Sequence, residues 1–235
     1  MTTIRGARER ARSEVTAAIK TEARRQLAAE GAAKLSLRAV ARELGMVSSA
    51  LYRYFPSRDD LLTALIIDAY DSVGSEAEAA LIPATDPADH PGHWVTVCVA
   101  VRRWALSHPH EYALLYGSPV PGYSAPRDTV GPASRVGAVL IAVTRDAART
   151  EALVVPTLSE EARPEAERLA AALAPDLPPA VVLRLVAAWS QLFGLVSFEV
   201  FGQFHRLVED REALFTQAVA QLAEDAGIRR QVRGD

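Results

Sequence analysis

Apolar residues return every three or four positions along almost the whole of this 235-residue chain. In residues 13–30, for example, Val15, Ile19, Ala23 and Leu27 recur every four residues and would form one face of a helix. We find no stretch in which apolar and polar residues alternate as they do in a strand. Only 6% of the residues are aromatic, and alanine, leucine and valine dominate, which also favours helices. The sequence therefore predicts an all-α fold.

The compartment can be inferred from the cysteine content and from the apolar runs. A single cysteine, Cys98, excludes an internal disulfide and is typical of a reducing compartment. The first twelve residues are polar and basic and lack the apolar stretch of a signal peptide. The longest apolar region, residues 185–201, is interrupted by Ser190, Gln191 and Glu199, so we expect a buried or interface helix there. These features predict a cytoplasmic protein.

Charge is distributed unevenly along the chain. Residues 1–60 carry twelve lysines and arginines against seven acidic residues, whereas the remainder carries fourteen against twenty-two. A basic front part on an acidic body is typical of a chain whose front part meets a polyanion. A solvated helix face with scattered arginines would give the same totals, so charge alone leaves both interpretations open.

Start and stop signals divide the chain into helices. Ser36 and Ser57 can cap helix N-termini, and Gly31, Gly45 and Gly227 can end helices in the left-handed conformation. Residues 1–12 would form a disordered basic arm and residues 228–235 a frayed tail. We expect helices near 13–30, 37–44, 47–53, 57–81, 91–107, 109–117, 132–150, 159–173, 178–201 and 210–226.

The short segment VSSALYRYFPSR, residues 47–58, is unusual because its outward face is so rich in binding groups. Leu51 and Phe55 lie four residues apart, share a helix face and can be buried together. The remaining surface then carries two hydroxyls, an aromatic ring and a guanidinium, from Ser48, Ser49, Tyr52 and Arg53.

Three short helices with a glycine turn between the second and the third form a helix-turn-helix unit, whose third helix lies in the major groove of DNA. Serine and tyrosine hydroxyls can bond phosphates or base edges. Arg53 can pair with guanine through two hydrogen bonds, and Ala50 is small enough to let the helix approach a thymine methyl.

The run LSLRAVARELGMVSSALYRYFPSRDDLL, residues 35–62, resembles the DNA-binding domain of the TetR/AcrR family of transcriptional regulators. The first helix ending at Gly31, the second helix LRAVARELGM, the segment SSALYRYF and the fourth-helix start PSRDDLL all match in order and spacing. The resemblance covers roughly residues 13–72 and implies a helix-turn-helix DNA-binding domain there.

The resemblance also implies a set of DNA contacts. Many family members have glycine or lysine where this chain has Ser49, which leaves the base preference open. Bases or backbone would be met by Ser48, Ser49, Ala50 and Tyr52, the groove edge by Arg53 and Tyr54, phosphates by Ser36, Arg38 and Arg58, and flanking DNA by Arg5, Arg8, Arg10 and Arg12.

Some of these residues have equally simple structural interpretations. Tyr54 could pack beside Leu51 instead of reaching DNA. Arg38 could pair with Glu43 or be solvated, and the N-terminal arm could be disordered without any contact.

The second part of the chain carries a further resemblance. The stretch WALSHPHEYALLYG, residues 104–117, is similar to the regulatory domain of a TetR subgroup with a tryptophan, a following His-Pro and a closing aromatic-glycine pair. This match covers roughly residues 93–201. It implies that residues 73–227 form a helical domain that dimerises and holds an effector.

Dimerisation would use the last two long helices, because residues 179–201 are apolar on more than one face. The same side chains could instead fill a monomer core. The candidate interface residues are Trp189, Leu192, Phe193, Val196 and Val200 with Leu214, Phe215, Ala218 and Leu222.

An effector pocket would be mostly apolar, which predicts a small hydrophobic or aromatic ligand. Aromatic residues at helical spacing equally suit a core. We expect no metal, because Cys98, His110 and Glu111 do not share a helical face, and no cofactor. The candidate lining residues are Trp94, Cys98, Trp104, Tyr112, Tyr116, Tyr123, Trp189 and Phe193.

The function predicted from these features is a homodimeric repressor that binds a palindromic operator in double-stranded DNA and is released by the effector. An enzyme is disfavoured, since the chain has no GxSxG motif, phosphate loop or catalytic carboxylate pair. A DNA-binding adaptor regulated by a protein partner is the alternative that the sequence separates least well.

Overall fold

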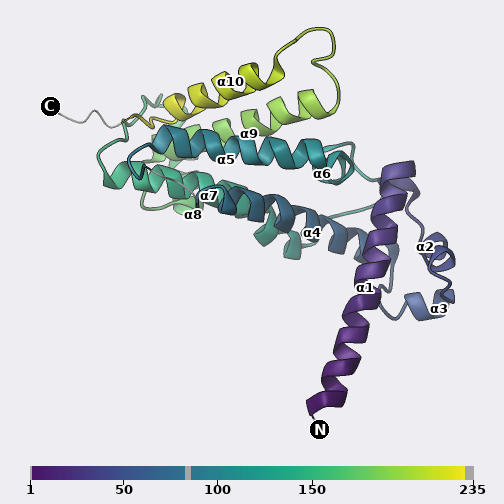
Figure 1. The fold of residues 1–235 in the computed structure, drawn as a ribbon. Coiled ribbons are helices and arrows are strands. Elements are labelled where there is room, and N and C mark those ends of the chain that lie inside the picture. Colours follow the sequence, from purple (N-terminus) through teal and green to yellow (C-terminus); the bar gives the residue numbers. More distant parts are fainter. Residues whose placement is uncertain (1, 83–85, 231–235) are drawn as a thin grey trace. The chain divides into compact units, whose positions relative to one another are not determined.

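The computed structural model describes residues 2–82 and 86–230, and almost all ordered structure in these ranges is helical (Figure 1). Two short 3-10 turns, η1 (Ala32–Lys34) and η2 (Arg127–Thr129), accompany the helices. Within the described ranges the one extended pairing is an isolated bridge between Leu153 and Ile228, so the all-α prediction is confirmed. The helices are α1 (Thr2–Glu30), α2 (Leu37–Glu43), α3 (Ser48–Leu51), α4 (Arg58–Ala79), α5 (His90–Ser107), α6 (Pro109–Tyr116), α7 (Val130–Arg149), α8 (Arg163–Leu173), α9 (Pro179–Val200) and α10 (Arg211–Asp225).

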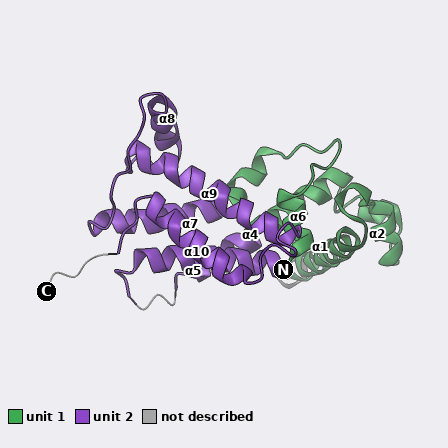
Figure 2. Cartoon of the chain, turned by 90° about the horizontal axis from the view of Figure 1, so that it is seen from above, with its two compact units in different colours: residues 1–71, 108–133 green, residues 72–107, 134–235 purple. Residues whose placement is uncertain are grey.

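The chain divides into two compact units, which are coloured separately in Figure 2. Unit 1 comprises residues 1–71 and 108–133, and unit 2 comprises residues 72–107 and 134–235. The first break falls inside α4, beside the domain boundary expected near residue 72. The segment 108–133, which the sequence assigns to the regulatory part, belongs to unit 1.

Capping side chains fix where several helices begin. The Ser36 hydroxyl accepts a hydrogen bond from the Ala39 amide at 3.4 Å at the start of α2. At the start of α4, the Ser57 hydroxyl accepts from the Asp60 amide at 3.1 Å and donates to the Asp60 carboxylate at 2.7 Å. The glycine between α2 and α3, Gly45, has φ of 63°, a left-handed conformation that allows the tight turn.

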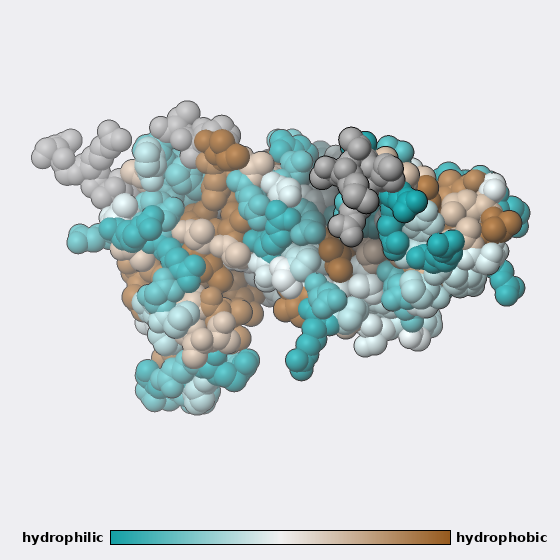
Figure 3. Space-filling view, turned by 90° about the horizontal axis from the view of Figure 1, so that it is seen from below, coloured by the Kyte–Doolittle hydropathy of each residue, from teal (hydrophilic) through white to brown (hydrophobic). Residues whose placement is uncertain are grey.

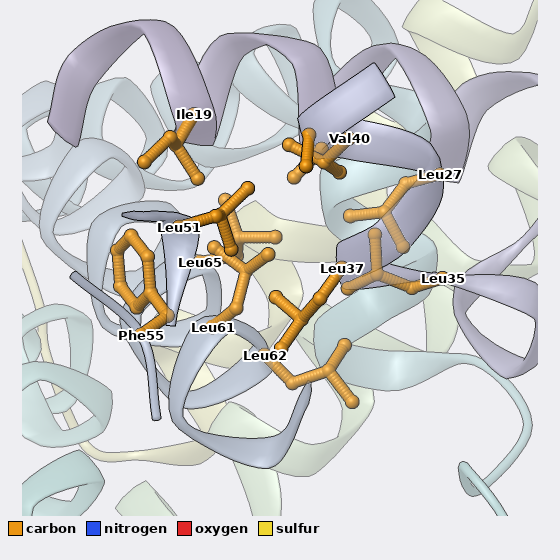
Figure 4. Close-up of a cluster of buried hydrophobic side chains, with 12 residues drawn as sticks. Ile19, Leu27, Leu35, Leu37, Val40, Leu51, Phe55, Leu61, Leu62 and Leu65 are labelled. Atoms are coloured by element: carbon orange, nitrogen blue, oxygen red, sulfur yellow. The ribbon is translucent and has the colours of Figure 1, made fainter. Parts of the chain in front are cut away.

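The core of unit 1 gathers apolar side chains from the first four helices around α3 (Figure 4). The members labelled in that view are Ile19, Leu27, Leu35, Leu37, Val40, Leu51, Phe55, Leu61, Leu62 and Leu65. Because α3 contains a single helical turn, these contacts rather than its own hydrogen bonds hold it in place.

Unit 2 is built around α5, α9 and α10, and a buried ion pair crosses between them. Arg102 of α5 donates two hydrogen bonds to the Glu199 carboxylate of α9, at 2.6 and 2.7 Å. Its guanidinium also lies 5.4 Å from the ring centre of Phe215 on α10. The burial of both charges inside this three-helix contact ties the ends of the helices together.

The predicted disordered arm is wrong, because α1 already begins at Thr2. Residues 4–12 consist mostly of arginine and alanine, which are good helix formers, and the weaker formers Thr2, Thr3 and Gly6 lie in the first two turns. Glu9 and Arg12 also lie three residues apart, a spacing that supports side-chain pairing along a helix.

The predicted frayed tail is also wrong for its first residues. Ile228 is fully buried, and its neighbour Arg229 donates its amide to the Ala152 carbonyl at 2.8 Å. The Val154 amide in turn donates to the Gly227 carbonyl at 2.8 Å. A buried isoleucine therefore anchors the chain to the segment after α7, whereas residues 231–235 lie outside the described range.

Candidate nucleic-acid interface

The orientation of α3 is set by two buried side chains. Leu51 and Phe55 are 1% and 7% exposed and pack into the core of unit 1, as the sequence predicts (Figure 4). Amide hydrogen bonds from Tyr52 to Ser48 and from Phe55 to Leu51, both 3.1 Å long, continue the helical path beyond α3. The opposite side of this segment is therefore turned towards solvent.

The outward face carries the polar groups expected to read DNA. Ser48, Ser49 and Arg53 are exposed, Tyr52 is 41% exposed and Ala50 is half-buried. Among the described residues, the four polar side chains have no hydrogen-bond or ion-pair partner. Two hydroxyls, a phenol and a free guanidinium thus stand together on a rigid support, which is the donor and acceptor set that base edges and phosphates require.

Tyr54 takes a different position. Its ring is half-buried against the core of unit 1, and the guanidinium of Arg12 lies over it at 5.6 Å from the ring centre. Of the two interpretations that the sequence left open, this geometry supports packing. It also brings one arginine of α1 next to the segment that follows α3.

Arg58 is committed to contacts inside unit 1. Its Nε donates to the Leu35 carbonyl at 3.2 Å, and its Nη2 donates to the carbonyls of Ala32 and Ala33 at 2.8 and 3.2 Å. Its Nη1 lies 3.5 Å from the Asp59 carboxylate. This guanidinium closes the end of η1, so its geometry supports a structural role and not the phosphate contact implied by the family resemblance.

The remaining candidates on α1 and α2 are available to differing degrees. Arg38 is exposed and does not pair with Glu43, whose partners are Arg42 at 3.6 Å and Arg25 at 3.9 Å. Ser36 is engaged as the cap of α2. Arg8 and Arg10 are exposed on the first turns of α1, and the side chain of Arg5 lies outside the described residues.

Part of the basic charge of α1 is neutralised within the unit. Lys20 and Arg24 both bind the carboxylate of Asp68 on α4, at 2.8 and 2.7 Å, and Arg24 also approaches Glu111 of α6 at 3.5 Å. The positive charge left for a polyanion therefore lies towards the start of α1 and around α3.

Three of the candidate ligand residues lie in unit 1. Tyr112 is fully buried, with its ring centre 5.0 Å from that of Tyr116. Burial raises the pKa of the Tyr116 hydroxyl, and its neighbour Tyr70 adds to the shift. The Tyr123 hydroxyl shares a hydrogen bond with Thr63 of α4 at 2.9 Å. These tyrosines hold α6 and the segment after it inside the DNA-binding unit.

The other five candidates lie in unit 2. Trp104 donates its indole N–H to the Ser72 hydroxyl at 2.8 Å, whereas the buried Nε1 of Trp94 has no acceptor among the described residues. Burial raises the pKa of the Cys98 thiol, so this cysteine is an unreactive core residue. Trp189 packs against Phe193 with ring centres 5.5 Å apart.

The predicted interface stripe on α9 and α10 mostly faces inward. Leu192 and Val196 are 0% exposed, and Phe193, Phe215 and Leu222 are also buried within the protomer. Four of them, Leu192, Phe193, Val196 and Phe215, belong to the core between α9, α10 and the rest of unit 2 and are not available to a partner, whereas Leu222 also lines a groove on α9 and α10. Trp189 and Leu214 remain exposed, and Val200 and Ala218 are half-buried.

The outer side of the same two helices holds a groove of about 670 Å³. Its most prominent apolar side chain, Phe198, is 53% exposed and packs on Phe204 with ring centres 5.6 Å apart. Figure 3 shows that apolar side chains reach the protein surface in several places among hydrophilic neighbours. Of the groove residues, the sequence singles out Ala218 and Leu222 alone, because serine, glutamine and glycine interrupt the apolar residues of α9 on this side. The groove is lined by Ser190, Gln191, Gly194, Leu195, Phe198, Phe204, Ala218, Gln221, Leu222 and Asp225.

Two families of known proteins match successive parts of the chain, and the second match includes residues 108–133, which the structure groups with unit 1. Residues 19–65 match the family described as bacterial regulatory proteins, tetR family, and residues 94–222 match the tetracyclin repressor-like C-terminal domain. The HTH-type transcriptional regulator Rv1816 of Mycobacterium tuberculosis is 41% identical over 206 residues, which cover 85% of this chain and 86% of that protein.

Solved structures are similar over nearly the full length. The regulatory protein SCO4313 has a TM-score of 0.75 and 35% identity, with 92% of this chain and 98% of that chain covered. RolR in complex with resorcinol has a TM-score of 0.51 and 17% identity, with 97% and 98% covered, which shows a shared fold alone.

Proposed function

Because this chain belongs to the TetR family of helix-turn-helix transcriptional regulators, it is a DNA-binding regulator and not an enzyme, and we propose that it acts as a homodimeric repressor. In this proposal two copies bind a palindromic operator in the cytoplasm, and a small, largely apolar effector releases them. The observation that carries the DNA-reading role is the exposed face of Ser48, Ser49, Tyr52 and Arg53, whose side chains have no partner among the described residues.

The proposed dimer follows from what reading a palindrome requires. A helix-turn-helix protein reads two half-sites about 34–36 Å apart through two-fold symmetry. The groove on the outer side of α9 and α10, with Phe198 at its centre, is the apolar surface that a second copy would cover. Its residues belong to both long helices, so two protomers would meet as a four-helix contact.

The proposed effector site lies among the aromatic residues of unit 2. The indole N–H of Trp94 is buried without an acceptor among the described residues, and a polar group on an otherwise apolar ligand could supply one. RolR, a protein of the same fold, is solved with the phenolic compound resorcinol. Because α4 runs from residues of unit 2 into unit 1, an effector that shifts residues 72–79 would bias the DNA-reading state.

A DNA-binding adaptor regulated by a protein partner is the second candidate. The exposed apolar side chains on α9 and after it, Phe198, Phe201 and Leu207, would serve that role equally well as a docking surface. If a small molecule alone releases the protein from DNA, the repressor proposal is favoured. An adaptor would be released or activated only when a partner protein is added.

The DNA-reading proposal is tested by replacing Arg53 with alanine. We expect a loss of about 1–3 kcal/mol in affinity for a selected operator, because a paired guanidinium contributes about that much discrimination. The measurement is fluorescence anisotropy with labelled duplexes. Arg103→Ala, which removes an exposed arginine from α5 in unit 2, is the matched control and should bind as the parent does. If both variants bind the operator with the same affinity, Arg53 does not contribute to DNA binding.

A further inference from the structure

Val47 is the most exposed large apolar side chain among the described residues of unit 1, at 69% exposure. It lies immediately before α3, next to the exposed serines Ser48 and Ser49. Its neighbour on the other side, Met46, is half-buried against the core of unit 1. Isolated exposed valines are common on protein surfaces. What distinguishes Val47 is its position within the segment that is proposed to read DNA.

The backbone around Val47 is held firmly. The Val47 carbonyl accepts hydrogen bonds from the amides of Ala50 and Leu51 at 2.9 and 3.4 Å, and the Met46 amide donates to the Ala41 carbonyl at 2.8 Å. Valine is branched at Cβ, which restricts rotation about χ1 outside helices as well. The two methyl groups therefore have few alternative positions and would lose little freedom in a contact.

The residue type is locally unfavourable at this position. Val47 has φ of −70° and ψ of 137°, the extended geometry of a helix cap, but no side-chain oxygen to bond the first amides of α3. Ser36 and Asp210 make the capping bond at the equivalent positions of α2 and α10, whereas α6, α8 and α9 begin without one after His108, Ala162 and Pro178. The missing capping bond is therefore not particular to α3, and what sets Val47 apart is its 69% exposure beside the proposed DNA-reading face.

We propose that Val47 makes an apolar contact with the methyl group of a thymine in each half-site of the operator. In a helix-turn-helix complex the leading residues of the recognition helix meet base edges in the major groove. Thymine is the base that presents a methyl group there, and apolar side chains read it by contact. This inference rests on the proposed DNA-reading function, and it adds a residue that neither the hydrogen-bonding pattern nor the charge of the segment identifies.

The test replaces thymine by deoxyuridine, one position at a time, in a selected operator duplex. This exchange removes the methyl group and leaves every hydrogen-bonding group unchanged. We expect the parent protein to lose about fivefold in affinity at one position of each half-site, a size typical of one buried methyl group. Val47→Ala should bind the thymine and deoxyuridine duplexes with nearly equal affinity at that position, because the variant lacks the side chain that contacts the methyl group.

Val47→Ser separates specificity from folding. Serine can cap α3, so the melting temperature should rise by about 2–4 °C for a chain of this size. Discrimination between thymine and uracil at that position should disappear in the same variant. A Val47→Ser protein that still discriminates there, or a parent protein that binds thymine and uracil equally at every position, would overturn the inference without affecting the proposal that the protein binds DNA. Absence of any selective DNA binding by the parent would instead overturn the proposed function.

Discussion

Arg58 shows how one side chain can shape the DNA-binding unit through hydrogen bonds to the unit's own backbone. Its guanidinium gathers the carbonyls of Ala32, Ala33 and Leu35, which are far from it in sequence, at the end of η1. These carbonyls lie just before α2, so the hydrogen bonds from the Arg58 guanidinium help to fix where α2 starts. A lysine carries its three N–H donors on a single nitrogen and cannot reproduce the planar fork that reaches these separate carbonyls.

Arg58→Lys should therefore lower the free energy of unfolding by about 1–2 kcal/mol, the usual range for lost charge-assisted hydrogen bonds at a partly exposed site. Urea denaturation followed by circular dichroism measures the change. Operator affinity at a temperature where both proteins are folded should stay close to that of the parent. Normal stability with weakened, salt-sensitive DNA binding would instead restore the phosphate contact that the family resemblance implies.

His90 is the residue whose burial couples folding to pH. It is 1% exposed at the start of α5, and its Nε2 shares a hydrogen bond with the Thr150 hydroxyl at 2.7 Å. Desolvation lowers the pKa of His90, and repulsion from His93 adds to the effect, whereas the carboxylates of Asp146, Asp89 and Asp86 oppose it. The folded protein therefore keeps this ring neutral at pH values where the unfolded chain protonates it.

The sign of the pH dependence follows directly. Since the unfolded state binds the extra proton, the contribution of His90 to stability is present above an ordinary histidine pKa of about 6.5 and is lost as the pH falls through that region. We expect the free energy of unfolding to fall between about pH 7.5 and 5.5, and His90→Gln to flatten this fall. His205→Gln, which alters an exposed histidine, is the control. An unchanged slope in His90→Gln would contradict the assignment.

At the scale of single helices, periodicity identified the elements well but not always the face that is buried. The 3.6-residue pattern predicted α4, α5, α6, α7, α9 and α10 to within a few residues, because each carries a clear apolar stripe and a capping or stop residue. On α9 apolar residues lie on more than one side, and the stripe that the sequence predicts as an interface mostly forms the core. Sequence alone does not say which of two apolar faces meets the rest of its own chain.

The start of α1 was missed for a related reason. Helix propensity is a weak signal where no apolar stripe accompanies it, and residues 2–12 are mostly polar. The face of α3 was predicted correctly because Leu51 and Phe55 left one orientation for a buried pair. The role of Arg58 required the fold, since its carbonyl partners lie 23 to 26 residues away.

Phe198→Asp tests the proposed interface on the outer side of α9 and α10. Phe198 is 53% exposed, so the substitution should leave folding within about 0.5 kcal/mol of the parent while charging the centre of the groove. We expect a monomer in sedimentation velocity at concentrations where the parent is a dimer. Val155→Asp changes an equally exposed apolar residue outside the groove and should stay dimeric. If Phe198→Asp remains a dimer, the groove around Phe198 is not the subunit interface.

Considered as a whole molecule, the chain places its basic, DNA-reading surface and its large apolar helices in separate compact units. Its formal net charge of −3 would repel DNA if it were spread evenly. The positive excess in residues 1–60, and the exposed Arg53 in particular, must therefore provide local attraction. Binding of such a protein to DNA should depend steeply on salt, because each phosphate that is neutralised releases condensed ions.

The central claim is that two copies of this chain read a palindrome through the exposed face of α3. Selection of sites from random duplex DNA by the purified protein, with the affinity of the best site measured against salt, tests it most directly. The account predicts an enriched palindrome with half-sites about one helical turn apart and a steep negative slope of log affinity against log salt. Weak binding without an enriched sequence would contradict it, because the face of α3 would then not be reading bases.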